Sequence, residues 1–367
     1  MHSMHIWQYE FKKLMTLPMF WIFLVLSLCL NTVIIWGYRY CIVDMDVLAD
    51  VQKEETRDET GEKLSVLWGC ENVYKNYDTN KLADAYIDVL GLTGITEKWV
   101  RNKYEKLQLV VNQLDKQEAA YNRYQDEETW QMHQLLFATL MRAIATEACL
   151  LAVLSMLYIF GYERQHRTEF TIYTTHIGRS VVRAKLVSGL AASGLAYIVV
   201  ACMTLLMFCL AFDYSEVWSS SVSSGFNYVS EITGIKPFIT WIPLSVGQYL
   251  AIMLALIFVL VLVFGLIGAA LGSLIRNTYL AAVCFFVGAL GMLAAPYIFV
   301  DLGLWSGYFL AQTLPICLWF SLSEWLTDMS MVSLIPFHET VGICLNLIVW
   351  SGIVWFSLRW FNRRDIL

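Results

Sequence analysis

The sequence predicts an all-α, polytopic membrane protein with six transmembrane helices. Of its 367 residues, 58% are hydrophobic and only 15% are charged, whereas soluble domains are closer to half apolar and a quarter charged. A helix needs about 20 mainly apolar residues to cross the hydrocarbon core of a bilayer. Six stretches meet this requirement: residues 17–37, 143–162, 186–211, 247–275, 279–299 and 337–358. No small-residue cleavage motif follows the first stretch, so we expect a retained signal anchor.

The basic residues predict the orientation of the chain. Short cytoplasmic loops are enriched in Lys and Arg. If the N-terminus is cytoplasmic, nearly all basic residues outside the 38–133 loop fall on inner segments, and the outer loops after the second span hold only Lys236. The 38–133 loop is acidic on balance, and long translocated domains follow this rule poorly. We therefore expect a multi-pass protein of the plasma membrane with both termini in the cytoplasm.

This topology divides the chain into predicted segments. They are 1–37, an interfacial helix and the first transmembrane helix; 38–133, an extracellular and mostly helical domain; 134–162, the second transmembrane helix; 163–185, a cytoplasmic loop; 186–301, the third to fifth transmembrane helices; 302–336, extracellular re-entrant helices; and 337–367, the sixth transmembrane helix and a cytoplasmic tail.

Residues 4–16 have the pattern of an amphipathic helix. Trp7, Phe11 and Leu14 are spaced so that they fall on one helical face. We expect this helix to lie on the inner membrane surface before Pro18 begins the first span. The alternative is an ordinary charged flank.

The large outer loop is long enough to form a small core of its own. A helix is predicted from Asp78 or Thr79 to just before Gly91. A second, amphipathic helix is predicted from Glu97 toward the second span, with a fold-back near residues 124–129, because no Gly or Pro interrupts this part of the sequence.

The second of these helices is unlike a coiled coil. Val100, Leu107 and Leu114 recur every seven residues, as a coiled coil requires. Lys103 and Gln117 occupy intervening positions that a coiled coil fills with apolar residues. We therefore expect this helix to pack on one side and to face water on the other.

Residues 302–336 could be a seventh span or a pair of short re-entrant helices. A seventh crossing would place the basic C-terminal tail outside, against the positive-inside rule. Pro315, between Asp301 and Glu324, also favours broken helices. Such backbone is tolerated at membrane depth only where protein covers it. We expect the re-entrant pair.

Common catalytic and ligand-binding motifs are absent from the sequence. There is no G-x-x-x-x-G-K-[ST] loop for phosphate, no H-E-x-x-H zinc motif, no G-x-S-x-G nucleophile motif and no Cys/His cluster with metal-ligand spacing. We therefore expect no catalytic, metal or cofactor site in this chain. If chemical energy drives its function, another subunit must supply it.

Two charged residues, Arg142 and Glu147, stand at the start of the second predicted span. Charges inside a membrane are costly and are functional candidates by default. Five positions along a helix separate these two by about 140°, so they do not pair with each other on one helix. We favour an outer-edge residue with a partner on another helix over a substrate or proton site.

Small residues and two outer cysteines indicate further contacts. Gly265, Gly268 and Gly272 in the fourth span let helix backbones approach closely, either inside the bundle or at a dimer seam. Cys41 and Cys70 in the outer loop could form a disulfide in an oxidising exterior, or both could stay reduced.

The connector between the second and third spans reads GYERQHRTEFTIYTTHIGRSVVRAK, residues 161–185. Glu163 lies just inside the membrane, and Lys185 opens the third span. Gly178, followed by Arg179, can end a short helix and let the chain turn back. By spacing alone, a docking site for a soluble partner and a plain positive-inside connector are equally supported.

The order of these parts resembles the permease subunits of ATP-binding-cassette exporters of the ABC-2 type, which have the type V exporter fold. In that family, the second span is followed by an acidic residue, a Thr-rich stretch, a small residue with Arg, and a Lys that opens the third span. This sequence matches with Glu163, Thr168, Gly178, Arg179 and Lys185. It lacks the Pro that usually precedes the Arg-bearing turn and the Leu pair upstream. The resemblance extends over the whole chain except the 38–133 loop.

The resemblance implies that this chain is the transmembrane permease subunit of an ATP-driven exporter. Two permeases, identical or siblings, would enclose a path, and separate ABC ATP-binding subunits, which bind ATP and Mg, would grip the 161–185 loops through the five matching residues. The few charges along the predicted path favour an amphipathic cargo such as a lipid, a peptide or a drug. We expect membrane lipids around the spans and no nucleic-acid partner.

Two other classes of function remain open. The chain could be a membrane-anchored sensor or assembly protein whose extracellular domain binds a ligand. It could also be a membrane enzyme that acts through Glu147 or His338, although no constellation of residues supports that reaction.

Overall fold

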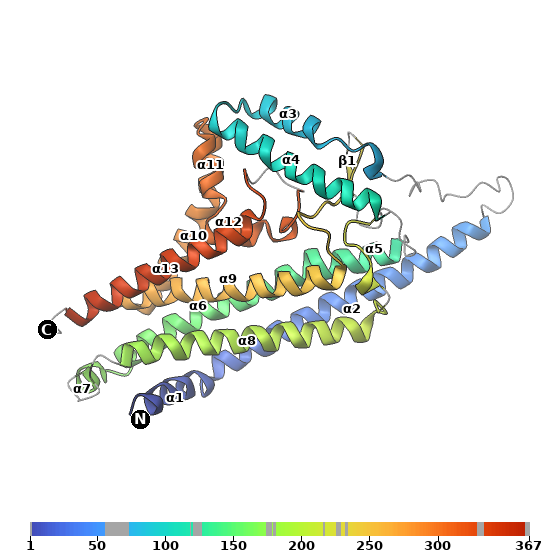
Figure 1. Ribbon diagram of the computed structural model, residues 1–367. Coiled ribbons are helices and arrows are strands. Elements are labelled where there is room, and N and C mark those ends of the chain that lie inside the picture. Colours follow the sequence, from blue (N-terminus) through green and yellow to red (C-terminus); the bar gives the residue numbers. More distant parts are fainter. Residues whose placement is uncertain are drawn as a thin grey trace.

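The computed structural model describes residues 2–55, 73–117, 119, 127–173, 178, 181–215, 217–224, 229–231, 234–328 and 334–363. Long helices form an elongated bundle (Figure 1). Helices α1 and α7 and the end of α13 gather at one end of the bundle, which we call the α7 end, and helices α3 and α4 lie over the other, which we call the α4 end.

The elements follow one another in a simple order. They are α1 (His2–Met15), α2 (Pro18–Glu55), η3 (Val73–Asn76), α3 (Thr79–Leu90), α4 (Ile95–Lys116), α5 (Glu127–Gln134), η4 (Leu135–Leu140), α6 (Met141–Gln165), α7 (Glu169–Tyr173), α8 (Val181–Ala211), η6 (Val217–Ser219), β1 (Val229–Glu231), β2 (Gly234–Lys236), α9 (Val246–Leu274), α10 (Thr278–Asp301), α11 (Trp305–Ala311), α12 (Pro315–Phe320), η8 (Leu322–Glu324) and α13 (His338–Arg363). The element η4 is a π-helical turn, and η3, η6 and η8 are 3-10 turns.

Six helices of the described chain are long and apolar enough to cross a membrane. They are Pro18–Tyr40, Thr129–Gln165, Val181–Ala211, Val246–Leu274, Thr278–Asp301 and His338–Trp360. The six predicted spans are therefore confirmed as helices, and the chain is a multi-pass membrane protein by length and composition. The only β-structure in the described residues is a short antiparallel ribbon of β1 and β2, which departs from the all-α expectation.

Helix α6 lies at the centre of the bundle, and α10 lies at its margin. Helix α6 packs mainly against α9 and α8. In the most apolar window of the span that ends in α6, 72% of the residues are buried, compared with 11% for α10. Most of α10 therefore presents apolar side chains outward.

Glycines of α9 make the close packing in the centre possible. A Cβ at Gly268 would lie 2.9 Å from the Val153 carbonyl oxygen, and one at Gly272 would lie 2.9 Å from the Phe160 Cβ. At Gly265 it would lie 3.0 Å from Leu190 of α8. The space that these glycines leave is thus filled by α6 and α8 of the same chain, whereas the sequence left a dimer seam open.

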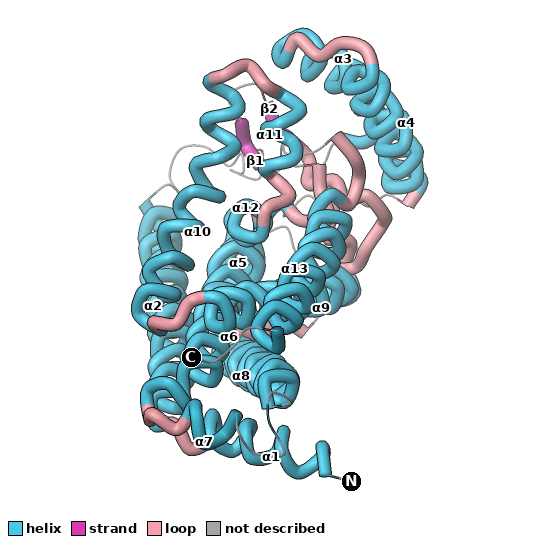
Figure 2. The backbone as a smooth tube through the Cα atoms, turned by 90° about the vertical axis from the view of Figure 1, so that its left-hand side faces the viewer, coloured by secondary structure: helices cyan, strands magenta, loops and turns pink. Residues whose placement is uncertain are grey.

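Two short helices, α11 and α12, stand between α10 and α13 in place of a seventh span (Figure 2). Helix α12 packs among α6, α9, α10 and α13. Its Cys317 Sγ donates to the carbonyl of Met292 (3.3 Å), in the middle of α10, and its Trp319 Nε1 donates to Thr146 Oγ1 (3.0 Å). Protein therefore covers this broken backbone, as a re-entrant segment requires.

Helices α3 and α4 form a hairpin at the α4 end. The Asp78 carboxylate accepts from the backbone N–H of Asn80 (3.0 Å) and so caps the start of α3, and Gly91 ends that helix with a φ of 59°. The hairpin shares one apolar cluster with the loops below it, which contribute Ile239, Trp241 and Leu334. The outer domain is thus packed onto the bundle.

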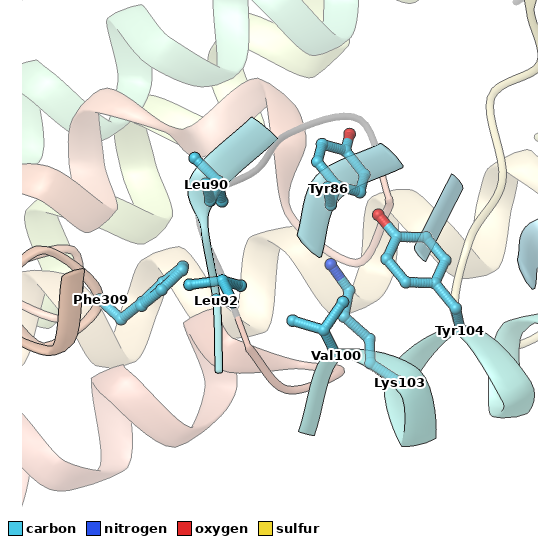
Figure 3. Close-up of a pocket in the computed structure, with 7 residues that line it drawn as sticks. All are labelled: Tyr86, Leu90, Leu92, Val100, Lys103, Tyr104 and Phe309. Atoms are coloured by element: carbon cyan, nitrogen blue, oxygen red, sulfur yellow. The ribbon is translucent and has the colours of Figure 1, made fainter. Parts of the chain in front are cut away.

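A buried ion pair reinforces this contact. Lys103 Nζ of α4 lies 3.1 Å from Asp328 Oδ1, and the two side chains are 3% and 6% exposed. The Lys103 amine also lies over the rings of Tyr104 (4.9 Å) and Trp241 (5.2 Å). Burial, with the nearby Asp328 carboxylate, raises the pKa of Tyr104 far above its ordinary value. A small pocket beside Lys103 (Figure 3) has a free volume of ≈ 10 Å³, which is the space of about one water molecule.

Two helix boundaries differ from the predicted ones. Helix α2 continues to Glu55 instead of ending near residue 37, because neither Gly nor Pro follows Gly37 in this stretch. Helix α4 ends earlier, at Lys116, and the chain is helical again from Glu127. The predicted fold-back at 124–129 lies mostly outside the described residues.

Candidate functional site

Four charged residues from three helices meet at the α7 end of the bundle. They are Glu10 and Lys13 of α1, Glu163 of α6 and Lys185 of α8, and we call them the ion cluster. The side chains of Glu163 and Lys185 are each 1% exposed. Charges this deeply buried are unfavourable unless opposite charges and hydrogen bonds compensate them.

The ion cluster supplies that compensation. Lys185 Nζ pairs with Glu163 Oε2 and donates to the carbonyl of Ile159 (2.9 Å). Lys13 Nζ donates to Glu163 Oε1 (2.9 Å) and to Glu10 Oε1 (2.6 Å). Two carboxylates therefore face two ammonium groups, and no net charge is left inside the protein.

The same contacts fix α1 against the spans. Helix α1 packs mainly against α8 and also against α2 and α6. Leu14, from its predicted apolar face, is fully buried, and the backbone carbonyl of Trp7 accepts from Ser188 Oγ (2.7 Å). The Lys13 amine lies 4.8 Å from the centre of the Tyr162 ring. The expected amphipathic helix is therefore present, and its apolar face packs on protein.

Directly after Glu163, helix α6 ends in a strained turn. Arg167 has a φ of 55°, a left-handed conformation that usually requires Gly. The Thr168 N–H donates to the Glu163 carbonyl (2.9 Å), which closes the turn in the Schellman pattern. The side chains of Gln165, Arg167 and Thr168 are exposed. Backbone strain in an exposed segment is frequent where partners bind.

The neighbouring connection to α10 holds this turn in place. Arg164 Nη1 donates to the carbonyl of Ile275 (2.8 Å), and Gln165 Nε2 donates to Thr278 Oγ1 (3.4 Å). A Cβ on Gly161 would lie 2.2 Å from Thr278 Oγ1, so only Gly permits this approach. The exposed turn is therefore anchored to the α9–α10 connection as well as to the ion cluster.

The structure brings together only some of the residues that the sequence singled out. Glu163 and Lys185 are paired, and the Thr168 backbone closes the turn beside them. Gly178 has a φ of 52°, which suits the turn-back expected of it, but Arg179 lies outside the described residues. The side chains of Cys41 and Cys70 also lie outside the described part of the chain.

Arg142 and Glu147 have separate partners. The Arg142 guanidinium donates to Ser323 Oγ (3.3 Å), on the η8 turn. The Glu147 carboxyl is 7% exposed and accepts from the side-chain amide of Asn31 on α2 (3.0 Å). Glu147 thus has its partner on another helix, as favoured from the sequence, but that partner carries no charge.

No residue of the ion cluster is arranged as a nucleophile with a base, and no group of three or more potential metal ligands occurs among the described residues. What the cluster does is mechanical: it joins α1, α6 and α8 at the point from which the exposed turn emerges. The chain matches no protein-family model, no curated protein sequence and no solved structure. Its function must therefore be inferred from the residues themselves.

Sequence reasoning missed two members of the ion cluster. Glu10 and Lys13 were assigned to the flank of an interfacial helix, far along the chain from Glu163. The one available signal is their i, i+3 spacing beside the apolar face of that helix. Spacing of this kind predicts a local ion pair but not the distant partner.

Proposed function

We propose that the chain is the transmembrane permease subunit of an ATP-driven exporter. It moves an amphipathic substrate, such as a lipid, a peptide or a drug, out of the cell and uses a separate ABC ATP-binding subunit for energy. The observation that carries the proposal is the exposed, strained turn at 165–168, which is fixed to three helices through the buried ion cluster.

This arrangement suits a coupling element. A partner that pulls or pushes on the turn acts directly on Glu163, and Glu163 is joined to Lys13 and Lys185. Because these contacts are buried and charge-assisted, they are stiff compared with exposed ion pairs. Movement of the turn is therefore passed to α1, α6 and α8 together.

Two further features support transport by a pair of permeases. Helix α10 exposes large apolar residues along its length, including Tyr279, Val287, Leu290 and Tyr297, so lipid or a second permease can cover it. The spans between Val246 and Val300 carry a single charged residue, Arg276, in the connection between them. A path beside these helices favours apolar or amphipathic cargo over small ions.

Co-purification of an ATPase tests this proposal. The tagged chain is expressed in its native membrane and purified gently, and its partners and ATP hydrolysis are measured. Charge reversal at the turn, Arg167→Glu with Thr168→Glu, is preferable to Glu163→Lys, because Glu163 is buried and its reversal would disturb folding. Lys106→Glu, on the exposed face of α4, is the matched control.

We expect an ATPase to accompany the wild-type chain and the Lys106→Glu variant, and to be lost from the turn variant while its thermal unfolding stays unchanged. A folded chain that purifies without any ATPase contradicts the proposal. So does a turn variant that keeps both the ATPase and export.

A sensor or assembly protein is the second candidate, and one observation favours it. The α3–α4 hairpin has an apolar core that includes Leu107, Leu114 and Tyr104, which is more structure than a simple connecting loop needs. A sensor would keep a ligand bound to this domain and would need no ATPase. The same purification separates the two candidates.

A further inference from the structure

A polar junction lies inside the bundle where α2, α6 and α8 meet. Glu147 is 7% exposed, and Asn31 and Thr204 are fully buried. The Asn31 amide nitrogen donates to Glu147 Oε2 (3.0 Å) and to Thr204 Oγ1 (2.9 Å). One neutral amide therefore joins a carboxyl group and a hydroxyl group from three different spans.

No basic residue of the surrounding helices serves this carboxyl group. The α9 sequence contains no charged residue, and neither does α8 after Lys185 or α2 between Pro18 and Tyr38. The nearest cations have other partners: Arg142 donates to Ser323 Oγ (3.3 Å), Arg39 lies over the Trp36 ring (5.1 Å), and Lys185 pairs with Glu163.

The other titratable groups nearby add no positive charge. Tyr197 of α8 donates to the Leu254 carbonyl (2.7 Å), and Tyr249 of α9 donates to the Trp325 carbonyl (3.1 Å). Cys149 follows Glu147 on α6 and is buried. From the adjoining η8 turn comes Glu324, a second acid, while α10 and α12 bring no charged residue near the level of Glu147.

Two buried oxygen atoms of the junction lack a hydrogen-bond donor. They are Glu147 Oε1 and Asn31 Oδ1. A carboxylate is an acceptor only, whereas a protonated carboxyl group also donates one hydrogen bond. One proton on Glu147 therefore removes the uncompensated charge and supplies the missing donor. Because Asn31 amide oxygen and nitrogen can exchange places by a flip of the side chain, the Asn31 oxygen is the acceptor at hand.

A metal cation fits this junction less well than a proton does. Hard cations such as Ca²⁺ or Mg²⁺ take about six or more oxygen ligands, and the described junction offers only the side chains of Glu147, Asn31 and Thr204. The two oxygens without a donor are also closed off from solvent. A proton needs no additional space.

We propose that Glu147 is a reversible proton-binding site within the membrane-spanning bundle, closed by Asn31 and Thr204. In the closed arrangement the carboxyl group is neutral. When α2 moves away from α6 and α8, water enters, the O–H bond breaks, the electron pair stays on the carboxylate and the proton passes to water. This site does not depend on the proposed exporter function.

Infrared spectroscopy of the purified chain in lipid nanodiscs tests the site directly. The spectrum of Glu147→Gln is subtracted from that of the wild type at neutral pH. We expect the difference to contain the carbonyl stretch of a protonated carboxylic acid, to shift in deuterated water, and to disappear reversibly at alkaline pH. Glu105→Gln, a matched change at an exposed residue of α4, should show only carboxylate bands.

Carboxylate bands in the Glu147 difference spectrum would overturn the proposal, and so would an acid band that never exchanges with deuterium. Thermal unfolding gives an independent result. Because glutamine mimics the neutral acid, we expect Glu147→Gln to unfold within about 2 °C of the wild type. A large loss of stability would mean that the ionised form holds the junction together, which also contradicts a protonated Glu147.

Discussion

The two ends of the bundle each contain a buried pair of lysine and carboxylate, but the pairs are built differently. At the α7 end, Lys185 and Glu163 belong to a cluster that also includes Lys13 and Glu10. At the α4 end, Lys103 meets Asp328 between the rings of Tyr104 and Trp241. The first pair joins three helices of the bundle, and the second joins the outer domain to a loop.

The difference lies in what remains after one partner is removed. In the ion cluster, a second charged group of each sign stands within reach, so a lost contact is partly replaced. Beside Lys103, the printed carboxylate contact is with Asp328, and aromatic rings fill much of the remaining surroundings. We therefore expect the α4 end to depend more strongly on a single substitution than the α7 end does.

The largest effect is expected for Asp328→Leu. It leaves a buried ammonium group, and breaking a buried pair in this way costs about 3–5 kcal/mol. Hydrogen exchange should show the loss as faster exchange throughout α3 and α4. The double variant with Lys103→Met should recover most of the stability, since an apolar replacement of both partners is often neutral. Equal losses in the single and double variants would show that the pair is not the source of the effect.

Glu163→Gln should come next, at about 3 kcal/mol or slightly less. It removes the carboxylate that Lys185 and Lys13 share, although Glu10 still compensates Lys13. Chemical unfolding of this variant, of Lys185→Met and of the double variant forms a thermodynamic cycle. We expect the double variant to lose clearly less than the sum of the two single losses. Additive losses would contradict a direct pair.

Gly268→Ala tests the seam of α6 and α9 that connects the two ends. The added Cβ would lie 2.9 Å from the Val153 carbonyl oxygen, and overpacking of this kind costs about 1–3 kcal/mol. Thermal unfolding of Gly288→Ala provides the control, because a Cβ there meets nothing within 4 Å in the chain. We expect the control to be neutral or slightly stabilised through helix propensity. A destabilised control would indicate that another chain covers α10.

Lys13→Met should have the smallest effect, at about 1 kcal/mol or less. Its side chain is 24% exposed, and Lys185 remains to compensate Glu163. Hydrogen exchange should increase in α1 but stay unchanged in α6 and α8. If Lys13→Met weakened the bundle as much as Glu163→Gln does, the cluster would not have the redundancy described above.

The spans were predictable from sequence because each is a local property of a continuous apolar stretch. The same holds for the α3 helix, whose cap at Asp78 and stop at Gly91 lie within it. Glu163 and Lys185 could be selected because they flank one short connector. Their remaining partners could not, since Glu10 and Lys13 are distant in sequence and became neighbours only through the docking of α1.

Two buried polar contacts were beyond the reach of pattern analysis for the same reason. Lys103 was recognised as a charge on an otherwise apolar helical stripe, but nothing in its surroundings along the chain pointed to Asp328. Glu147 was recognised as an intramembrane acid, and its amide partner Asn31 sits unremarked in the first span. A lone charge in an apolar pattern therefore indicates that a partner exists without indicating which residue it is.

The span that ends in α6 is longer than a membrane requires. Its 37 residues, Thr129–Gln165, extend about 55 Å at 1.5 Å per residue, whereas the bilayer core is about 30 Å thick. The strained turn sits at one tip of this rod, and the chain leading from the outer domain enters at the other. A tilt imposed at either tip is thus felt at the opposite face without any intermediate joint, apart from the single π turn of η4, which is the one place along the rod where twist could be absorbed.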